Sequence, residues 1–100
     1  MTQQILLVGG VGRMEPQYRT AVEARGFELI YYEKRIPAGT PPRDLAAVLI
    51  VVPICSHSLR EYAEQLAQQQ RAPVFHLRTA SISAVKRALT DLREGSHPCG

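Results

Sequence analysis

Apolar positions along this chain follow two alternating patterns. Short runs of consecutive apolar residues, or of β-branched and aromatic residues, are typical of strands buried on both faces. Longer stretches in which apolar residues recur every three or four positions are typical of helices that pack on one side. The predicted strands are residues 4–8, 27–33, 47–52 and 73–77, and the predicted helices are residues 14–25, 58–71 and 81–92.

The ends of these segments carry residues that favour starting or ending a helix. Pro16 suits the first turn of the first helix, because the N–H that it lacks would have no helical partner there. Ser58 and Glu61 have the spacing of a capping box and predict the start of the second helix. Residues 34–43 (KRIPAGTPPR) contain three prolines and a glycine, and they predict a loop.

Strands that alternate with helices predict an α/β fold, in which helices cover a parallel sheet. Right-handed crossovers favour a small doubly wound, Rossmann-like sheet of about four strands in the order 2-1-3-4, flanked by three helices. The chain then reverses direction between strands 1 and 3, and such folds bind ligands outside the carboxyl ends of the strands at that point. We expect residues 1–93 to form one domain and residues 94–100 to form a flexible tail.

Composition and charge narrow the class of protein. Of the 100 residues, 45% are apolar and 21% are charged, as in an ordinary soluble domain. The formal charge of +3 does not by itself indicate nucleic-acid binding. The N-terminus lacks the basic region of a signal peptide, and no segment approaches the ~20 apolar residues of a membrane span. We therefore expect a cytoplasmic protein that binds neither nucleic acid nor a membrane.

A histidine, His57, stands at the junction between the third strand and the second helix, where residues 51–58 read VVPICSHS. Near the start of a helix, the positive end of the dipole disfavours a charged imidazole. A neutral imidazole can ligate iron or zinc, or act as a neutral electrophile. The alternative is a surface histidine or a capping contact. The neighbouring Cys55 could be a thiolate ligand or a nucleophile, but a small buried hydrophobe is the simpler interpretation.

The glycine turn after the first strand consists of Gly9, Gly10, Val11 and Gly12. The dinucleotide fingerprint G-x-G-x-x-G, started at Gly10, would need a glycine where this chain has Glu15. A carboxylate in the first turn of a helix would also repel a pyrophosphate. A tight turn that lets the backbone pass close to a ligand or a helix is therefore the favoured interpretation.

Several polar side chains near these loops could hold an anion. Arg13 follows the glycine turn and Arg78 follows the fourth strand, so each could bind carboxylates or phosphates of a ligand. Ser81, together with Thr79 and Ser83, lies near the start of the last helix and adds hydroxyl donors.

Three stretches of the chain together resemble the domain of unknown function 2325 family. The chain opens with ILLVGG, follows its third strand with the pair Ser56-His57, and continues after its fourth strand with residues 77–83 (LRTASIS). Members carry a Ser-His-Asn run and an LRSSSLS-type run at these places. Ser58 and the pair Thr79-Ala80 therefore depart from the family pattern. The resemblance spans about residues 5–92.

The resemblance implies a Rossmann-like subunit that forms a homodimer. Some members bind heme and act as dioxygenases that open the indole ring, which implies heme iron as cofactor, and O2 and a small aromatic molecule as substrates. His57 would be the axial ligand of the heme iron and the catalytic residue. A two-fold dimer would let each subunit cover the heme of the other. The residues expected to contact the heme are Gly10, Val11, Gly12, Arg13, Pro53, Cys55, Ser56, His57, Arg78 and Ser81.

Two other functions stay open on the sequence alone. The first is a non-catalytic module that senses an anionic ligand or a nucleotide through residues 9–12, Arg78 and Ser81. The second is an interaction domain that takes no small ligand. Protection by phosphate against thermal unfolding, without colour on addition of heme, would favour the first of these two.

Overall fold

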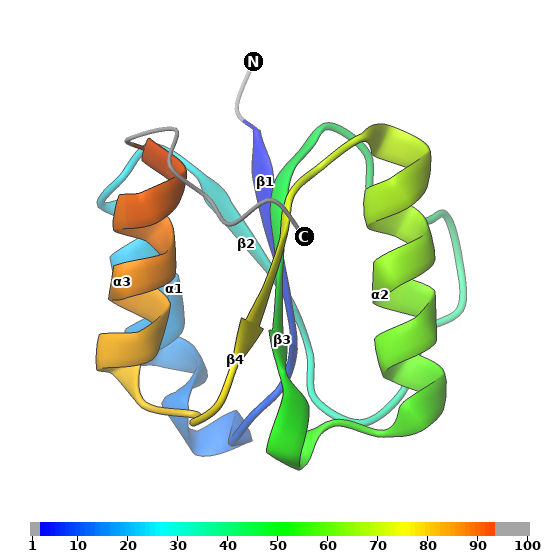
Figure 1. Cartoon of the computed structure of the whole chain (residues 1–100), viewed down its shortest axis with the longest axis horizontal. Coiled ribbons are helices and arrows are strands. Elements are labelled where there is room, and N and C mark those ends of the chain that lie inside the picture. Colours follow the sequence, from blue (N-terminus) through cyan, green and yellow to red (C-terminus); the bar gives the residue numbers. More distant parts are fainter. Residues whose placement is uncertain (1–2, 94–100) are drawn as a thin grey trace.

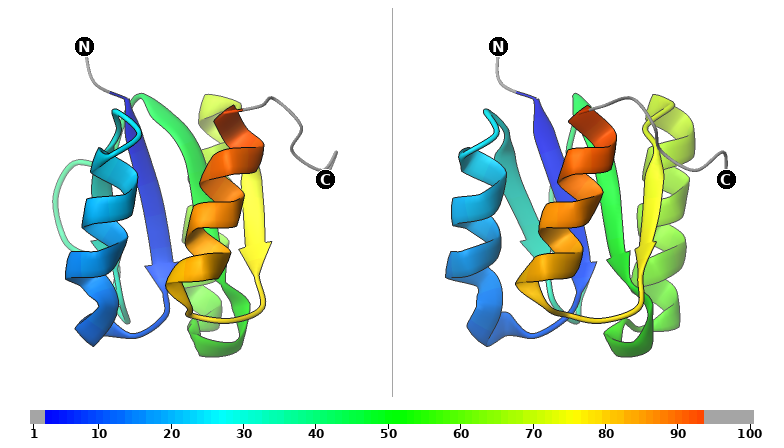
Figure 2. Two further views of the ribbon diagram at one scale, coloured as in Figure 1. Left: turned by 90° about the vertical axis from the view of Figure 1, so that its left-hand side faces the viewer. Right: turned by 60° about the vertical axis from the view of Figure 1, so that its left-hand side comes forward.

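The computed structural model describes residues 3–93 and shows one parallel sheet between helices. The four strands lie in the order β2-β1-β3-β4, which confirms the predicted topology. Helices α1 and α3 cover one face of the sheet, and α2 covers the other (Figure 1). Figure 2 shows α1 and α3 side by side in front of the strands. The predicted tail, residues 94–100, lies outside the described residues.

The elements follow the predicted alternation, with two short 3-10 turns added at the carboxyl ends of β1 and β3. The strands are β1 (Gln4–Gly9), β2 (Glu28–Tyr32), β3 (Leu45–Val51) and β4 (Val74–Leu77). The helices are α1 (Glu15–Glu23), α2 (His57–Gln70) and α3 (Ile82–Arg93), and the 3-10 turns are η1 (Gly12–Met14) and η2 (Val52–Ile54).

The start of α2 differs from the prediction. Its N-cap is Ser56, whose backbone is extended and whose side-chain oxygen accepts a hydrogen bond from the N–H of Leu59 at 3.3 Å. The predicted capping box of Ser58 and Glu61 is therefore wrong, and His57 is the first residue of the helix. The third strand ends at Val51, one residue before its predicted end, and Val52 is the first residue of η2. Pro53 favours this end, because it has no N–H to donate to a neighbouring strand.

The core forms two apolar layers, one on each face of the sheet. Successive residues of β1 alternate between them, and the run from Ile5 to Val8 is buried, as its sequence predicts. On the α1 and α3 side, Leu7 and Leu49 pack with Tyr18. On the α2 side, the strands pack against a stripe of helical residues. That stripe consists of Leu59, Ala63, Leu66 and Ala67.

The predicted loop between β2 and β3 contains no regular helix or strand, but its end is held in place. The side chain of Gln70, at the end of α2, donates from Nε2 to the carbonyl of Pro42 at 2.7 Å. Its Oε1 accepts from the N–H of Leu45 at 3.0 Å. One amide side chain thus ties the last turn of α2 to the start of β3. Within residues 3–93, no helix combines the length and the apolar character needed to cross a bilayer.

Candidate functional site

Two loops meet where β1 and β3 end, at the lower end of the sheet in Figure 1. The N–H of Gly10 donates to the carbonyl of Ile54 at 2.9 Å, which joins the glycine turn to η2. Gly9 has a φ of +83°, and a Cβ built there would lie 2.5 Å from the Ile54 oxygen and 2.8 Å from Cβ of Cys55. Only glycine fits this position, because both the space and the backbone angle exclude a side chain.

The third loop, between β4 and α3, is linked to the same end of the molecule by Tyr18. This side chain is buried, and its hydroxyl donates to the carbonyl of Ala80 at 2.6 Å. Ser81 follows, and its Oγ accepts from the N–H of Ala84 at 3.3 Å and lies 2.9 Å from Oγ1 of Thr79. The hydroxyl of Ser81 therefore stabilises the start of α3.

His57 lies on the surface at the first turn of α2. Its side chain is 84% exposed, and its Nε2 lies 2.7 Å from Oε1 of Glu61, one helical turn further on. A neutral imidazole that donates from Nε2 to Glu61 leaves the lone pair of Nδ1 open to solvent. Because none of residues 3–93 covers the ring, an incoming group can reach it without rearranging the core.

Three exposed apolar residues, Val52, Pro53 and Ile54, form a ledge just before His57, and we call them the η2 ledge. Val52 is 37% exposed and Ile54 is 48% exposed. Large apolar side chains that lie exposed next to one another mark a surface that contacts a ligand or another protein. The ledge and the imidazole thus bring apolar contact and a nitrogen ligand to one end of the sheet.

Cys55, between the ledge and His57, is half-buried and protonated. Burial raises the pKa of its thiol, with the Glu64 carboxylate adding to the rise and Arg60 opposing it. Sγ lies 3.6 Å from the carbonyl oxygen of Ser56, where a thiol can donate a weak hydrogen bond. These features favour the interpretation of Cys55 as a small apolar side chain at the end of a strand.

The glycine turn already holds a carboxylate from this chain. The N–H of Gly12 donates to Oε2 of Glu33 at 3.2 Å, and a Cβ at Gly12 would collide with that carboxylate. Glu15 lies in the first turn of α1 and pairs with Arg19. In dinucleotide-binding folds the corresponding amides face phosphates, so Glu33 stands where an anion would bind. This geometry favours the tight-turn interpretation.

These three loops fall within the span of a known protein family. A family model described as "Uncharacterized protein conserved in bacteria (DUF2325)" matches residues 4–92. The chain belongs to this family. No curated protein matches the chain. The span shared with the family runs from β1 almost to the end of α3, and so includes the glycine turn, the η2 ledge and His57.

Sequence reasoning about this family member missed Glu33 and Tyr31. The hydroxyl of Tyr31 is buried and has no hydrogen-bond partner among residues 3–93. Burial raises its pKa, and the charge of Glu33 adds to the rise. Its ring lies 5.8 Å from that of Tyr18, centroid to centroid. The only signal in the sequence was position, because Tyr31 lies near the end of β2, which neighbours β1, and Glu33 follows that strand.

The two arginines expected at the site are free of ion pairs. Arg13 and Arg78 are exposed at the carboxyl end of the sheet, and neither pairs with an acidic residue within the described part of the chain. Val11 is half-buried at the glycine turn. The two cations are thus open to an anionic group that approaches this end.

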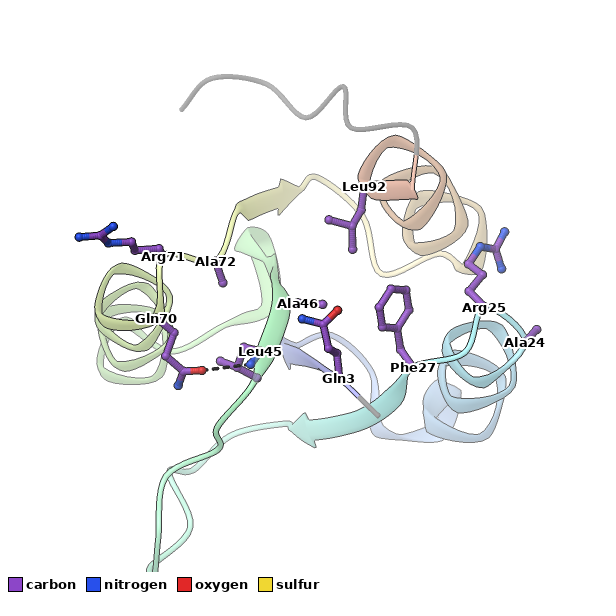
Figure 3. Close-up of a pocket in the computed structure, with 10 residues that line it drawn as sticks. All are labelled: Gln3, Ala24, Arg25, Phe27, Leu45, Ala46, Gln70, Arg71, Ala72 and Leu92. Carbon is purple, nitrogen blue, oxygen red and sulfur yellow. Dashed lines mark hydrogen bonds between the residues drawn. The ribbon is translucent and has the colours of Figure 1, made fainter. Parts of the chain in front are cut away.

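A hollow of about 650 Å³ lies at the opposite, amino-terminal end of the sheet (Figure 3). None of the predicted site residues lines it. Gln70 accepts a hydrogen bond from the N–H of Leu45 on its α2 side, and Phe27, which precedes β2, and Leu92 of α3 point into it. Its lining residues are Gln3, Ala24, Arg25, Phe27, Leu45, Ala46, Gln70, Arg71, Ala72 and Leu92.

The exposed side chains at the carboxyl end are of the kinds that heme requires, and within the described residues they form no site for a metal ion held by protein ligands alone. Within residues 3–93, no three His, Cys, Asp or Glu side chains gather in an arrangement that could hold a metal ion. Heme needs one axial ligand from the protein, apolar contact for the macrocycle and cations near its propionates. His57, the η2 ledge and the free arginines supply these three kinds of group. The ledge is open, however, so enclosing a macrocycle there needs a second surface.

Proposed function

We propose that this chain binds heme beside His57 and, with heme bound, acts as a dioxygenase that opens the ring of indole or a related small aromatic. The observation that carries the proposal is the exposed imidazole of His57 at the start of α2, next to the η2 ledge. Support for the substrate comes only from the resemblance to the family, some members of which act as dioxygenases that open the indole ring.

His57 is suited to be the axial ligand because little has to change for its ring to bind iron. The ring is 84% exposed, so an incoming group can reach it, and an imidazole nitrogen is a common metal ligand. The contact with Glu61 is an exposed i, i+4 pair, and such pairs contribute only about 0.3–0.5 kcal/mol. An iron–nitrogen bond is far stronger and replaces this contact readily.

The neighbouring residues would hold the rest of the group. Val52, Pro53 and Ile54 offer apolar contact to the macrocycle, and Arg13 and Arg78 offer charge to its propionates. These residues bind and orient the group and exclude water from its face.

A second copy of the chain would complete the pocket. A domain of 100 residues whose ledge is open leaves one face of a bound macrocycle in water. A two-fold axis near the ledge would bring the apolar ledges of two subunits together. We therefore propose a homodimer in which each subunit shields the heme of the other.

The reaction would need no acid or base from the protein. Heme, when bound, supplies the iron that activates O2. Cleaving one carbon–carbon double bond of the aromatic places one oxygen atom on each carbon. The four electrons that reduce O2 come from that double bond, so no external reductant is needed.

Titration with hemin tests the proposal. The full chain, prepared without heme, should develop one Soret band per chain that saturates at stoichiometric hemin. His57→Ala should lose the band or shift its position. His76→Ala is the matched control, because His76 is also exposed and also pairs with a glutamate, Glu64, at 3.1 Å. It should titrate like the parent protein.

The opposite outcome would be clear. If the parent does not bind hemin, the proposed function is wrong. If His57→Ala gives the spectrum and affinity of the parent, His57 is not the ligand. A protein that binds hemin but does not consume O2 with indole is a heme protein of another function. The anion-sensing alternative has less support, because Glu33 already engages the amide of Gly12.

A further inference from the structure

Strand β4 ends the sheet on one side, and its outer edge faces no other strand among residues 3–93. It pairs only with β3, in parallel, with Val74 opposite Val48 and His76 opposite Ile50. Figure 2 shows β4 at the rim of the sheet, beside α3. An edge strand presents backbone N–H and C=O groups that another strand can pair with.

The register identifies the groups that point outward. In a parallel pair, each residue bonds to the two residues that flank its partner. Val48 donates to the carbonyl of Pro73 at 2.9 Å, so it is bonded to residues 73 and 75 on either side of Val74. Ile50 is related in the same way to residues 75 and 77. The N–H and C=O groups of Val74 and His76 therefore point away from β3.

A hollow of about 360 Å³ lies between this strand and α3. Phe75 and Leu77 from β4, and the small residues Ala84 and Ala88 from α3, provide its apolar lining. Because the two alanines have short side chains, an apolar side chain from an added strand has room above them. The hollow thus lies where alternate side chains of such a strand would point.

The charges at this hollow favour an acidic partner. Arg78 and Arg87 line it, are exposed, and form no ion pair with any described residue. Asp91 is the acidic residue in the lining. A second copy would bring the arginines of two chains, each of net charge +3, towards each other. Like charges oppose that arrangement, whereas glutamates on a partner would neutralise the arginines.

We propose that the β4 edge binds an extended segment of another protein as a fifth strand of the sheet, and that the side chains on the face of this segment towards α3 include both apolar and acidic residues. Backbone pairing with Val74 and His76 provides affinity, as in other cases of strand addition. The apolar residues fill the hollow over Ala84 and Ala88, and the acidic residues pair with Arg78 and Arg87. Arg78 also belongs to the proposed heme site, but the β4 edge, Ala84, Ala88 and Arg87 do not, so this surface can be tested without heme and apart from the proposed function.

Fluorescence anisotropy with a model peptide tests the proposal. The probe is a fluorescein-labelled peptide with valine and glutamate in turn at every second position and threonine between them, the valine–glutamate peptide, and it is added to the full chain without heme. Saturable binding that weakens as salt is added is the expected result, because charge pairs contribute to it. Two control peptides have lysine in place of glutamate, or N-methyl groups on alternate amides. Neither should bind, and the methylated peptide tests backbone pairing without any change in the protein.

Variants locate the site. His76→Pro removes an outward N–H but leaves the pairing of Phe75 and Leu77 with β3, and proline is tolerated on an edge strand. It should weaken binding by about tenfold. His76→Ala, which keeps the amide, should stay within about twofold of the parent. Arg87→Glu should weaken binding, and Lys34→Glu in the distant loop should not. Circular dichroism confirms that each variant is folded.

Several outcomes would overturn the proposal. One is that the valine–glutamate peptide does not bind, and another is that it binds His76→Pro as tightly as the parent. If sedimentation shows a dimer that His76→Pro dissociates, the occupant of the edge is a second copy. If the peptide binds only to a chain that ends at Arg93, the terminal residues of the chain occupy the edge.

Discussion

The N–H of Gly12 donates a hydrogen bond to the carboxylate of Glu33 at 3.2 Å and joins the turn after β1 to the residue that follows β2. The two residues are 21 positions apart. Their contact places a negative charge at the start of α1, where a Rossmann-like fold that binds dinucleotides has a phosphate. The ligand in the proposed function therefore lies not at the glycine turn but beside the η2 ledge and His57.

Two glycines at this end should respond differently to substitution. Gly9→Ala should lower the free energy of unfolding by about 2–4 kcal/mol, because its Cβ meets the backbone of Ile54 and its φ is positive. Gly12→Ala should cost about 1 kcal/mol or less, because the Glu33 side chain can move away and only its hydrogen bond is lost. Urea denaturation measures both values.

Gly26→Ala separates the two causes at Gly9. Gly26 has a φ of +84°, but nothing lies within 4 Å of its Cβ position. This variant should lose about 1 kcal/mol from the backbone angle alone. If Gly9→Ala and Gly26→Ala lose the same free energy of unfolding, the loop that contains Ile54 moves away from the new Cβ at no cost, and the close approach at Gly9 contributes nothing.

Tyr18→Phe should destabilise the protein. The substitution removes the hydroxyl that donates to Ala80 at 2.6 Å and leaves a partly buried carbonyl without its donor. A loss of about 1–2 kcal/mol is expected in thermal or urea unfolding. Tyr62→Phe is the control, because the Tyr62 hydroxyl makes no hydrogen bond within the described residues. The free energy of unfolding of this variant should stay close to that of the parent.

Tyr31→Phe should act in the opposite direction. The buried hydroxyl of Tyr31 has no partner among the described residues, so removing it should stabilise the fold by about 0.5–1 kcal/mol at neutral pH. Burial raises the pKa of this tyrosine above its ordinary value of 10.0. Stability is therefore lost as the pH rises above 10.0, where the unfolded chain ionises first. Tyr31→Phe should lose less free energy of unfolding than the parent over that pH range. If Tyr31→Phe is instead less stable than the parent at neutral pH, the hydroxyl has a hydrogen-bond partner.

Acid should weaken the contact between α2 and β4. The hydrogen bond from His76 lowers the pKa of Glu64 below its ordinary value of 4.5, and Arg60 adds to the effect. A lowered pKa contributes stability that is present above pH 4.5 and is lost as the pH falls through the folded pKa. Because the groups are partly exposed, the contribution is small.

Glu64→Gln measures that contribution. The difference in stability between the parent and this variant should be largest near neutral pH and should shrink below pH 4.5. Glu23→Gln, which removes an exposed carboxylate without an ion pair in the described chain, is the control and should show no such trend. A constant difference for Glu64→Gln across acid pH would contradict the assignment.

The alternation of strands and helices, and from it the sheet order, could be predicted from the sequence. The continuous apolar run of β1 and the helical spacing of Leu59, Ala63 and Leu66 are local patterns, set by the repeat of each backbone conformation. Handedness of the crossovers then leaves few topologies. The position of His57 beside the carboxyl end of β3 follows from the same reasoning.

Only the tertiary structure decided which partners these residues have. The sequence predicted Ser58 as the cap of α2, whereas in the structure Ser56 has the extended conformation that a cap needs and its side chain accepts from the N–H of Leu59. Glu33 reaches Gly12 because β2 pairs with β1 in one register. Such contacts join residues far apart in the chain. Their geometry depends on how the layers pack, which no local pattern of apolar and polar residues contains.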